Sequence, residues 1–414
     1  MSTAVPPTTD VDDASVAAAA HKETLPTSGR ELLQRLRTGD LGSIRVLLLL
    51  AIVWIYFQSQ ESRFLSSTNL VNLSLQIAGL GLISVGIVLV LLLGEIDLSV
   101  GAVAGLTSAI MAVLTVKHGW APVPAIIAAI AVGAAIGAFQ GFISTRFGIP
   151  TFVVTLAGLL GWQGAQLKVL GETGTVNLLP GFVPDLAGKF LADSVGWIVA
   201  IALVAVYAAI AVVGRQRRVA AGLSAPPMTL LAVRIGAVAV AALVAVYIFN
   251  QDRGTPYALL ILIAFVAAFD FMTRRTRFGR HIYAVGGNAE AARRAGINVF
   301  RVRVAVFSLA SSMAAVGGIM LASRLLAVNQ STGGSDTLLL SIAAPVIAGT
   351  SLFGGRGSVW SALLGALVIG SINNGMDLLG YASPTKFMVT GAVLLGAVVL
   401  DSAARLGRQA SGRV

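Results

Sequence analysis

The sequence predicts an all-α fold, a polytopic helical membrane protein with about 12 transmembrane helices. Of its 414 residues, 56% are hydrophobic and only 11% are charged, whereas a soluble domain carries roughly a quarter of charged residues. The mean hydropathy of +0.87 is correspondingly high. Apolar runs recur along almost the whole chain, and about 20 apolar residues are enough for a helix to cross a bilayer. Little sequence is left for a soluble domain.

Twelve apolar runs are the candidates for these helices. They are 44–58, 71–93, 99–116, 122–144, 151–169, 195–213, 235–249, 256–272, 304–323, 338–353, 358–376 and 385–400. Small residues within them, as in GAAIGAFQG at 133–141, allow helix backbones to approach closely. The short run 338–353 is compatible with a full span or with a re-entrant segment.

Polar segments flank the apolar region at both ends. Residues 1–43 are rich in Ala, Ser and Thr and contain Pro6, Pro7 and Pro26, so they cannot bury enough apolar surface to fold alone. We therefore expect a disordered cytoplasmic tail over 1–43, a transmembrane domain over 44–402, and a short cytoplasmic tail over 403–414.

The distribution of basic residues predicts the orientation. With the N-terminus in the cytoplasm, 22 of the 29 Lys and Arg residues fall on the cytoplasmic side of the twelve runs. Cytoplasmic loops are enriched in Lys and Arg, and the inverted assignment would reverse that bias. Both termini are therefore expected in the cytoplasm. The same distribution explains the net charge of +11 without nucleic-acid binding.

The longest cytoplasmic loop, 273–303, contains the signature of a short helix. Asn288 is a suitable N-cap, Glu290 faces Arg294 four residues later, and Gly296 supplies a left-handed exit. An ordinary basic loop would explain the arginines, but membrane orientation has no use for a capped helix bounded by glycines. The loop is thus predicted to dock a partner. The residues of this predicted contact are Gly286, Gly287, Asn288, Glu290, Arg293, Arg294 and Gly296.

Two carboxylates, Glu95 and Asp97, lie between two apolar runs in the stretch LLGEIDLSVG at 92–101. Ionised carboxylates are costly in hydrocarbon and therefore face a protein interior or mark a functional path. They could bind a cation or a proton and drive secondary transport, or they could mark a helix break. Asp97 is placed to cap a helix that starts at Leu98 or Ser99, and we favour that reading. The role of Glu95 stays open.

Several chemistries are excluded or left without support. The chain has no cysteine and only three histidines, which removes thiolate chemistry and disfavours a metal site. The phosphate-binding pattern GxxxxGK[ST] does not occur, and no Ser/His/Asp or paired-His cluster falls at one membrane depth. The chain is therefore not expected to be an enzyme, and any ATP must be hydrolysed by another chain.

Three separated motifs together resemble a known family. They are LLGEIDLSVG (92–101), FGRHIYAVGGNAEAARRAGINV (278–299) and LFGGRGSVWSALLGALVIGSINNGMDLLG (352–380). In this order they are similar to the permease subunit of bacterial ATP-binding cassette sugar importers, the ribose, galactose and xylose permease family. The resemblance covers residues 64–402. It is greatest to the xylose-type members, which carry two spans beyond the ten of the ribose type, as the stretch 195–250 does here.

The resemblance implies a homodimeric permease in the bacterial cytoplasmic (inner) membrane that imports a monosaccharide, with D-xylose expected. It implies a cytoplasmic ATPase that carries the ATP and Mg, with no cofactor on this chain. It also implies a periplasmic or lipid-anchored sugar-binding protein as a further partner. Residues 284–297 match the family's cytoplasmic loop, which is taken to couple the permease to the ATPase. The competing hypothesis is an ion-coupled secondary transporter that uses Glu95 or Asp97.

A path for a neutral sugar should be lined by amides, hydroxyls and aromatic faces rather than by charges. Polar and aromatic residues within the predicted spans supply candidates. These are Gln140, Trp162, Gln163, Ser371, Asn373 and Asn374. Each of them could equally hydrogen-bond one helix to another.

Overall fold

The computed structural model describes residues 42–410, and these residues form fifteen helices and two three-residue strands. The helices are α3 (Gly42–Gln60), α4 (Ser67–Leu92), α5 (Val100–Val116), α6 (Pro122–Phe147), α7 (Thr151–Leu170), α8 (Phe182–Gly188), α9 (Asp193–Ala220), α10 (Met228–Phe249), α11 (Tyr257–Arg275), α12 (Arg277–Gly287), α13 (Ala289–Arg294), α14 (Val299–Leu325), α15 (Ser335–Ile347), α16 (Trp360–Leu378) and α17 (Ser383–Ala410). The strands are β1 (Thr175–Asn177) and β2 (Ala327–Asn329).

Each of the twelve predicted apolar runs overlaps one helix, so the helical membrane fold is confirmed. Within residues 42–410, six helices are both long and apolar enough to cross a bilayer: α4, α6, α9, α10, α11 and α14. Shorter apolar helices accompany them, among them α5 and α15. At 1.5 Å per residue, the 13-residue α15 is only about 20 Å long, which is less than the hydrocarbon thickness of about 30 Å.

The chain divides into two compact units, and residues 199–244 form the described part of the first. They comprise most of α9 and α10, with the loop 221–227 between them. This loop is held by two arginines of α9. Arg215 donates to the Pro226 carbonyl at 3.1 Å, and Arg218 donates to the Ser224 carbonyl at 2.9 Å.

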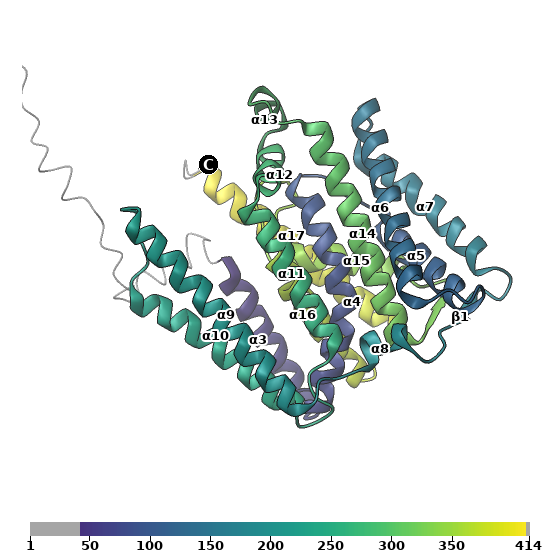
Figure 1. Ribbon diagram of the computed structural model, residues 1–414, viewed down its shortest axis with the longest axis horizontal. Helices are drawn as coiled ribbons and strands as arrows, with labels where there is room; N and C mark the ends of the chain where they lie inside the picture. The colour runs from purple at the N-terminus through teal and green to yellow at the C-terminus, as the bar shows by residue number, and fades with distance from the viewer. Residues whose placement is uncertain (1–41, 411–414) are drawn as a thin grey trace, which may run out of the picture. The chain divides into compact units, whose positions relative to one another are not determined.

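The second unit contains the remaining helices, and α4 and α14 run side by side through its middle (Figure 1). Glycines bring their backbones together. A side chain at Gly86 would overlap the carbonyl oxygen of Ala310, and one at Gly317 would overlap Ile83. Such close approach is how helices associate in lipid, where no hydrophobic driving force acts between them.

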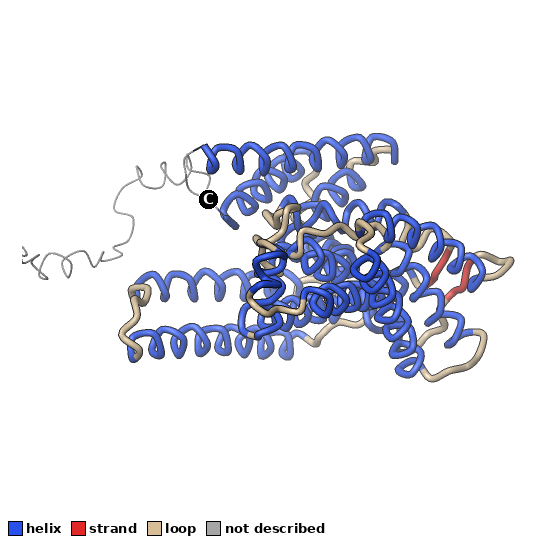
Figure 2. The backbone as a smooth tube through the Cα atoms, turned by 90° about the horizontal axis from the view of Figure 1, so that it is seen from above, coloured by secondary structure: helices blue, strands red, loops and turns tan. Residues whose placement is uncertain are grey.

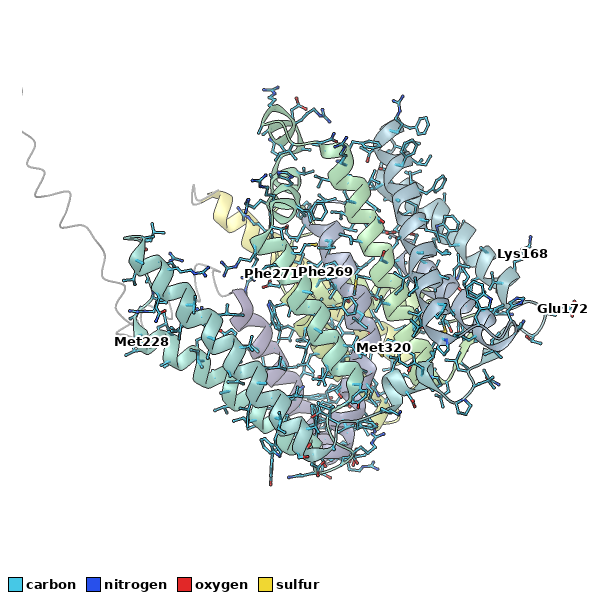
Figure 3. All side chains as sticks on the ribbon, viewed as in Figure 1. Lys168, Glu172, Met228, Phe269, Phe271 and Met320 are labelled. Carbon is cyan, nitrogen blue, oxygen red and sulfur yellow. The ribbon has the colours of Figure 1, made fainter. Side chains whose placement is uncertain are left out.

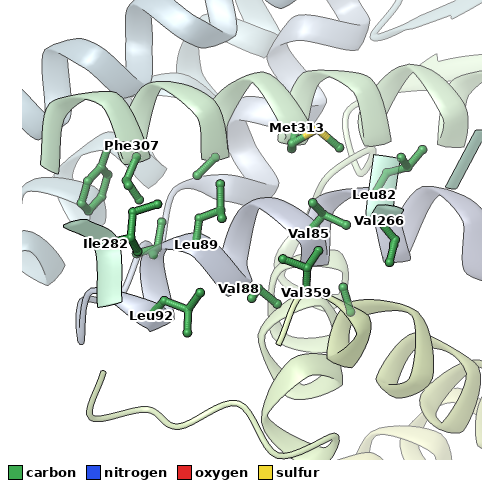
Figure 4. Packing of buried hydrophobic residues seen from close by; sticks show 14 of the residues in the cluster. Leu82, Val85, Val88, Leu89, Leu92, Val266, Ile282, Phe307, Met313 and Val359 are labelled. Carbon is green, nitrogen blue, oxygen red and sulfur yellow. The ribbon is translucent and has the colours of Figure 1, made fainter. Parts of the chain in front are cut away.

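The core around these two helices is apolar and fully enclosed. Leu82 and Leu89 of α4 pack with Val266 of α11, Ile282 of α12 and Phe307 of α14 (Figure 4). Figure 3 labels Met320, which is buried in this core, and Lys168 and Glu172, which are exposed at the periphery. The amphipathic α12 belongs to this core as much as the long helices do.

The bundle of the second unit has two distinct ends. At one, α12 and α13 lead into the start of α14, next to the last turn of α4; we call it the α13 end (Figure 1). At the other, β1 and β2 pair antiparallel with Val176 opposite Val328 (Figure 2); we call it the β1–β2 end. Gln166 of α7 fixes the turn after β2, because its amide nitrogen donates to the carbonyls of Asn329 and Thr332, both at 3.0 Å.

The predicted flanking tails meet the described range only in part. Helix α3 starts at Gly42, and residues 1–41 lie outside the described residues. Helix α17 continues past the predicted boundary at residue 402 as far as Ala410.

Candidate functional site

The predicted cytoplasmic helix is present at the α13 end, with the predicted cap and ion pair. The Asn288 side chain accepts a hydrogen bond from the Ala291 N–H at 2.9 Å. Glu290 lies 3.0 Å from Arg293 and 3.4 Å from Arg294, and Gly296 has a φ of +81°. Local sequence therefore determined this helix correctly. Its charged side chains are exposed, which leaves them free to meet another protein.

The helix before it, α12, is anchored to the bundle through glycines. A side chain at Gly286 would overlap the carbonyl oxygen of Leu92, the last residue of α4. That same carbonyl accepts a hydrogen bond from the Gly355 N–H at 2.9 Å. The Tyr283 hydroxyl donates to the carbonyl of Gly357 at 3.0 Å. Three backbone segments thus meet without side chains between them: the end of α4, the end of α12 and the loop before α16.

Glu95 lies beside this junction, in the break between α4 and α5. Its Oε1 is 2.7 Å from Nη2 of Arg303 on α14, and its Oε2 accepts a hydrogen bond from Thr151, the first residue of α7. The carboxylate is thus compensated by a neighbouring charge, as a carboxylate in a bilayer requires. It joins α14, which follows the α12–α13 segment directly, to the start of α7.

Asp97 lies deeper in the same break and is 2% exposed. Its Oδ1 accepts hydrogen bonds from the N–H and the hydroxyl of Ser99, at 2.8 and 2.7 Å. The N-cap of α5 is Ser99 itself, and the helix begins at Val100, one or two residues later than predicted. Asp97 therefore braces the turn that precedes the helix, two residues before its N-cap.

The predicted path residues fall into two groups. Gln140 lies next to the Asp97 turn, where its Oε1 is 3.0 Å from the Ser99 hydroxyl. Its amide nitrogen and the indole nitrogen of Trp162 have no hydrogen-bond partner within the described residues, and both lie against Gly158, where an added side chain would overlap them. Gln163 is half-buried one residue further along α7.

The second group lies on α16. Asn374 exchanges hydrogen bonds with Asn69 of α4, at 2.7 and 3.0 Å. Ser371 accepts a hydrogen bond from the Trp54 indole at 2.9 Å, and the half-buried Asn373 lies 3.5 Å from the Thr390 hydroxyl. The structure therefore brings together Gln140 with Trp162, and Asn374 with α4, but no hydrogen bond joins the two groups within the described residues.

Next to Asn374, the structure contains a polar cavity of about 340 Å³ at the β1–β2 end. Its polar lining combines residues of α4, α14 and α16, of which the sequence prediction found only Asn374. They are Asn69, Asn72, Gln76, Arg324, Asn374 and Asp377. The spacing of 69, 72 and 76 places three amides on one face of an otherwise apolar helix, and this was the signal available in the sequence.

Comparison with known proteins assigns the family. Residues 69–398 match the family described as branched-chain amino acid transport system / permease component. The xylose transport system permease protein XylH of Escherichia coli is 38% identical over 363 residues, which cover 87% of this chain and 92% of that protein.

Two further relatives agree with this assignment. The XylH protein of Haemophilus influenzae is 34% identical over 89% of this chain and 98% of its own length. The ribose import permease protein RbsC of Escherichia coli is 34% identical over 87% of this chain and 92% of its own length. No solved structure matches the chain. The resemblance drawn from three motifs is therefore confirmed: the chain belongs to the permease family of bacterial ATP-binding cassette importers.

Proposed function

We propose that this permease imports a monosaccharide across the bacterial cytoplasmic membrane and that D-xylose is its substrate. The similarity to XylH over 87% of the chain carries the proposal. The ribose permease RbsC covers the same 87% of this chain at the lower identity of 34%. ATP hydrolysis is supplied by a separate ATPase, and a sugar-binding protein delivers the substrate on the opposite face.

The chain acts as a homodimer with twelve spans per subunit and with both termini in the cytoplasm. Basic residues support this orientation, because Arg274, Arg275, Arg293 and Arg294 all gather near the α13 end. The β1–β2 end carries fewer basic residues, among them Lys168 and Arg324. The α13 end is therefore cytoplasmic under the positive-inside rule, and the β1–β2 end faces the periplasm.

The α12–α13 segment is the contact for the ATPase. Its exposed Glu290, Arg293 and Arg294 offer a charged docking surface, while its other side is packed on α4, α14 and the loop before α16. A push on α13 would reach three parts of the bundle at once, through the glycine junction at Gly286 and through the pair of Arg303 with Glu95. Closure of the ATPase would in this way switch access to the path.

The alternative, an ion-coupled transporter, has less support. Glu95 is paired with Arg303 and Thr151, so it offers no free carboxylate to a cation. Asp97 uses one oxygen to hold the turn before α5. Neither carboxylate has a second acidic side chain among its described contacts with which to share an ion.

The test is reconstitution of the permease with its ATPase and binding protein in proteoliposomes. We expect ATP hydrolysis to rise when the binding protein is loaded with xylose, and xylose to accumulate only with ATP present. Ribose and galactose, offered in turn, should be transported less well. Accumulation driven by an ion gradient in liposomes containing this chain alone would refute the proposal.

A further inference from the structure

The polar cavity at the β1–β2 end stands out because several of its lining side chains make few hydrogen bonds within the protein. Arg324 is exposed to solvent and lies close enough to Asp377 for their charges to interact, but its guanidinium makes no hydrogen bond or salt bridge with any residue from 42 to 410. The Gln76 carbonyl oxygen has one long contact, 3.4 Å from the Asn374 amide nitrogen. Within the same range, Asn72 accepts a hydrogen bond from Arg253 at 2.6 Å, and its own amide donates none. These side chains are exposed or half-buried, so water meets their polar groups in the free protein and a ligand would replace that water.

Asn69 and Asn374 behave differently from these three residues. Each donates to the other, and Asn69 also donates to the carbonyl of Phe64 at 2.7 Å. They are 7% and 3% exposed, so they serve as the rigid floor that holds α4 against α16. Packing between helices explains this pair completely, but it does not explain why further polar side chains face the cavity.

The chemistry of the lining indicates the class of ligand. Arg324 offers only donors, Asp377 offers acceptors, and the amides of Asn72 and Gln76 offer both. Asp377 is already paired with Lys386, so the lining offers no free carboxylate to a cation. A volume of about 340 Å³ falls at the lower end of the range of roughly 300–1,000 Å³ that is usual for small-molecule sites. A small molecule with several hydroxyl groups, such as a monosaccharide, matches both the mixture of donors and acceptors and the volume.

We infer that this cavity is the first sugar site of the permease, where a monosaccharide released at the periplasmic face is held by Arg324, Gln76, Asn72 and Asp377 before the path opens. The inference rests on the proposed function and on the orientation it includes. The lining contains no aromatic ring within the described residues, so recognition is by hydrogen bonds alone. The site accordingly tolerates related sugars, and selection among them belongs to the binding protein.

The experiment compares Arg324→Gln and Gln76→Leu with the control Lys168→Gln in the complete reconstituted complex. Lys168 is an exposed cation on α7 near the β1–β2 end and does not line the cavity. We expect each cavity variant to lower the amount of xylose transported per ATP by about tenfold, the effect of losing a hydrogen bond to a charged or desolvated group. ATP hydrolysis stimulated by the binding protein should stay unchanged, and the control should transport normally.

Other outcomes separate the ways in which the inference can fail. Normal transport by both cavity variants would overturn it while leaving the proposed function intact. Loss of ATP hydrolysis stimulated by the binding protein would also overturn it, because the cavity would then be a docking surface for that protein. If the unmodified complex hydrolysed ATP but moved no sugar, the proposed function itself would fail.

A labelling measurement guards against variants that merely fold poorly. The native chain has no cysteine, so Gln76→Cys would be its only reactive thiol. A maleimide that cannot cross the membrane should label it from the periplasmic side, and 100 mM xylose, roughly the concentration needed for a millimolar site to be saturated, should slow the labelling. Equal labelling with and without the sugar would contradict binding in this cavity.

Discussion

The two ends of the larger unit are built on opposite principles. At the α13 end, Gly286, Gly355 and the Leu92 carbonyl bring three backbones into direct contact. At the β1–β2 end, Asn72, Gln76 and Arg324 surround an open polar cavity. Backbone contact without intervening side chains transmits displacement, because a close-packed interior has no slack to absorb it. An open polar cavity instead has room for a ligand. Under the proposed function, force and cargo would therefore enter the molecule at different ends.

The largest expected effect tests the rigid end. In Gly286→Ala the added methyl group would overlap the Leu92 carbonyl oxygen, whereas in Gly287→Ala it would meet nothing within 4 Å. Overpacking of this kind costs about 1–3 kcal/mol, and it would displace α12 from α4. We expect Gly286→Ala to lower the thermal midpoint in detergent and to reduce ATP-driven uptake at least tenfold. Gly287→Ala should match the native protein in both measurements.

The adjacent position makes this test sharp. Both substitutions lie at the end of α12, and both replace glycine with the same residue. Neither glycine has a positive φ, so backbone strain does not separate the two variants. Equal behaviour of the two would show that the junction does not depend on close backbone contact, and the contrast between the two ends would be lost.

The second prediction concerns the ion pair between Glu95 and Arg303. Glu95→Gln leaves the guanidinium without its partner in a site where the two side chains are 15% and 28% exposed. Removal of one member of a buried pair costs about 3–5 kcal/mol, and partial exposure to solvent reduces this to roughly 1–2 kcal/mol. We expect a lower thermal midpoint and slower uptake. Arg303→Gln should act similarly.

A double-mutant cycle supplies the control for this pair. Because Glu95→Gln combined with Arg303→Gln removes both charges, the double variant should be more stable than the sum of the single effects implies. Additive losses would mean that the two groups do not interact in the folded protein. Glu95 would then regain its standing as a candidate ion site.

The sequence predicted the two ends unequally. Asn288, Glu290 and Gly296 lie within eight positions of one another, so capping and i,i+4 pairing could be read directly from local spacing. Asn69 and Asn374 are 305 positions apart, and nothing local indicates that they meet. The twelve apolar runs predicted the long helices because burial in lipid needs only composition.

The β1–β2 pair shows the same limit for backbone structure. Each strand has three residues, and Thr175 pairs with Asn329 across a long stretch of intervening chain. Neither segment alternates long enough to predict a strand. Asp97 shows the limit at the finest scale. An acid before a new helix predicted a capping interaction, but the choice of Ser99 as N-cap depends on the turn that Asp97 itself holds.

The smallest effect on stability, with the clearest effect on coupling, is expected from the exposed charges of α13. Glu290 and Arg294 are 58% and 80% exposed and lie 3.4 Å apart, and such pairs contribute about 0–1 kcal/mol. Combined Glu290→Arg and Arg294→Glu substitutions keep the net charge and a pair between positions 290 and 294, but they remove the Glu290–Arg293 pair and invert the charge pattern offered to a partner. The thermal midpoint should stay within about 2 °C, because the change in stability is at most a few tenths of a kcal/mol. Copurification with the ATPase and sugar uptake should both be lost. Unchanged association and uptake would remove the ATPase from this surface, and α13 would then be an ordinary basic loop whose charges only orient the protein in the membrane.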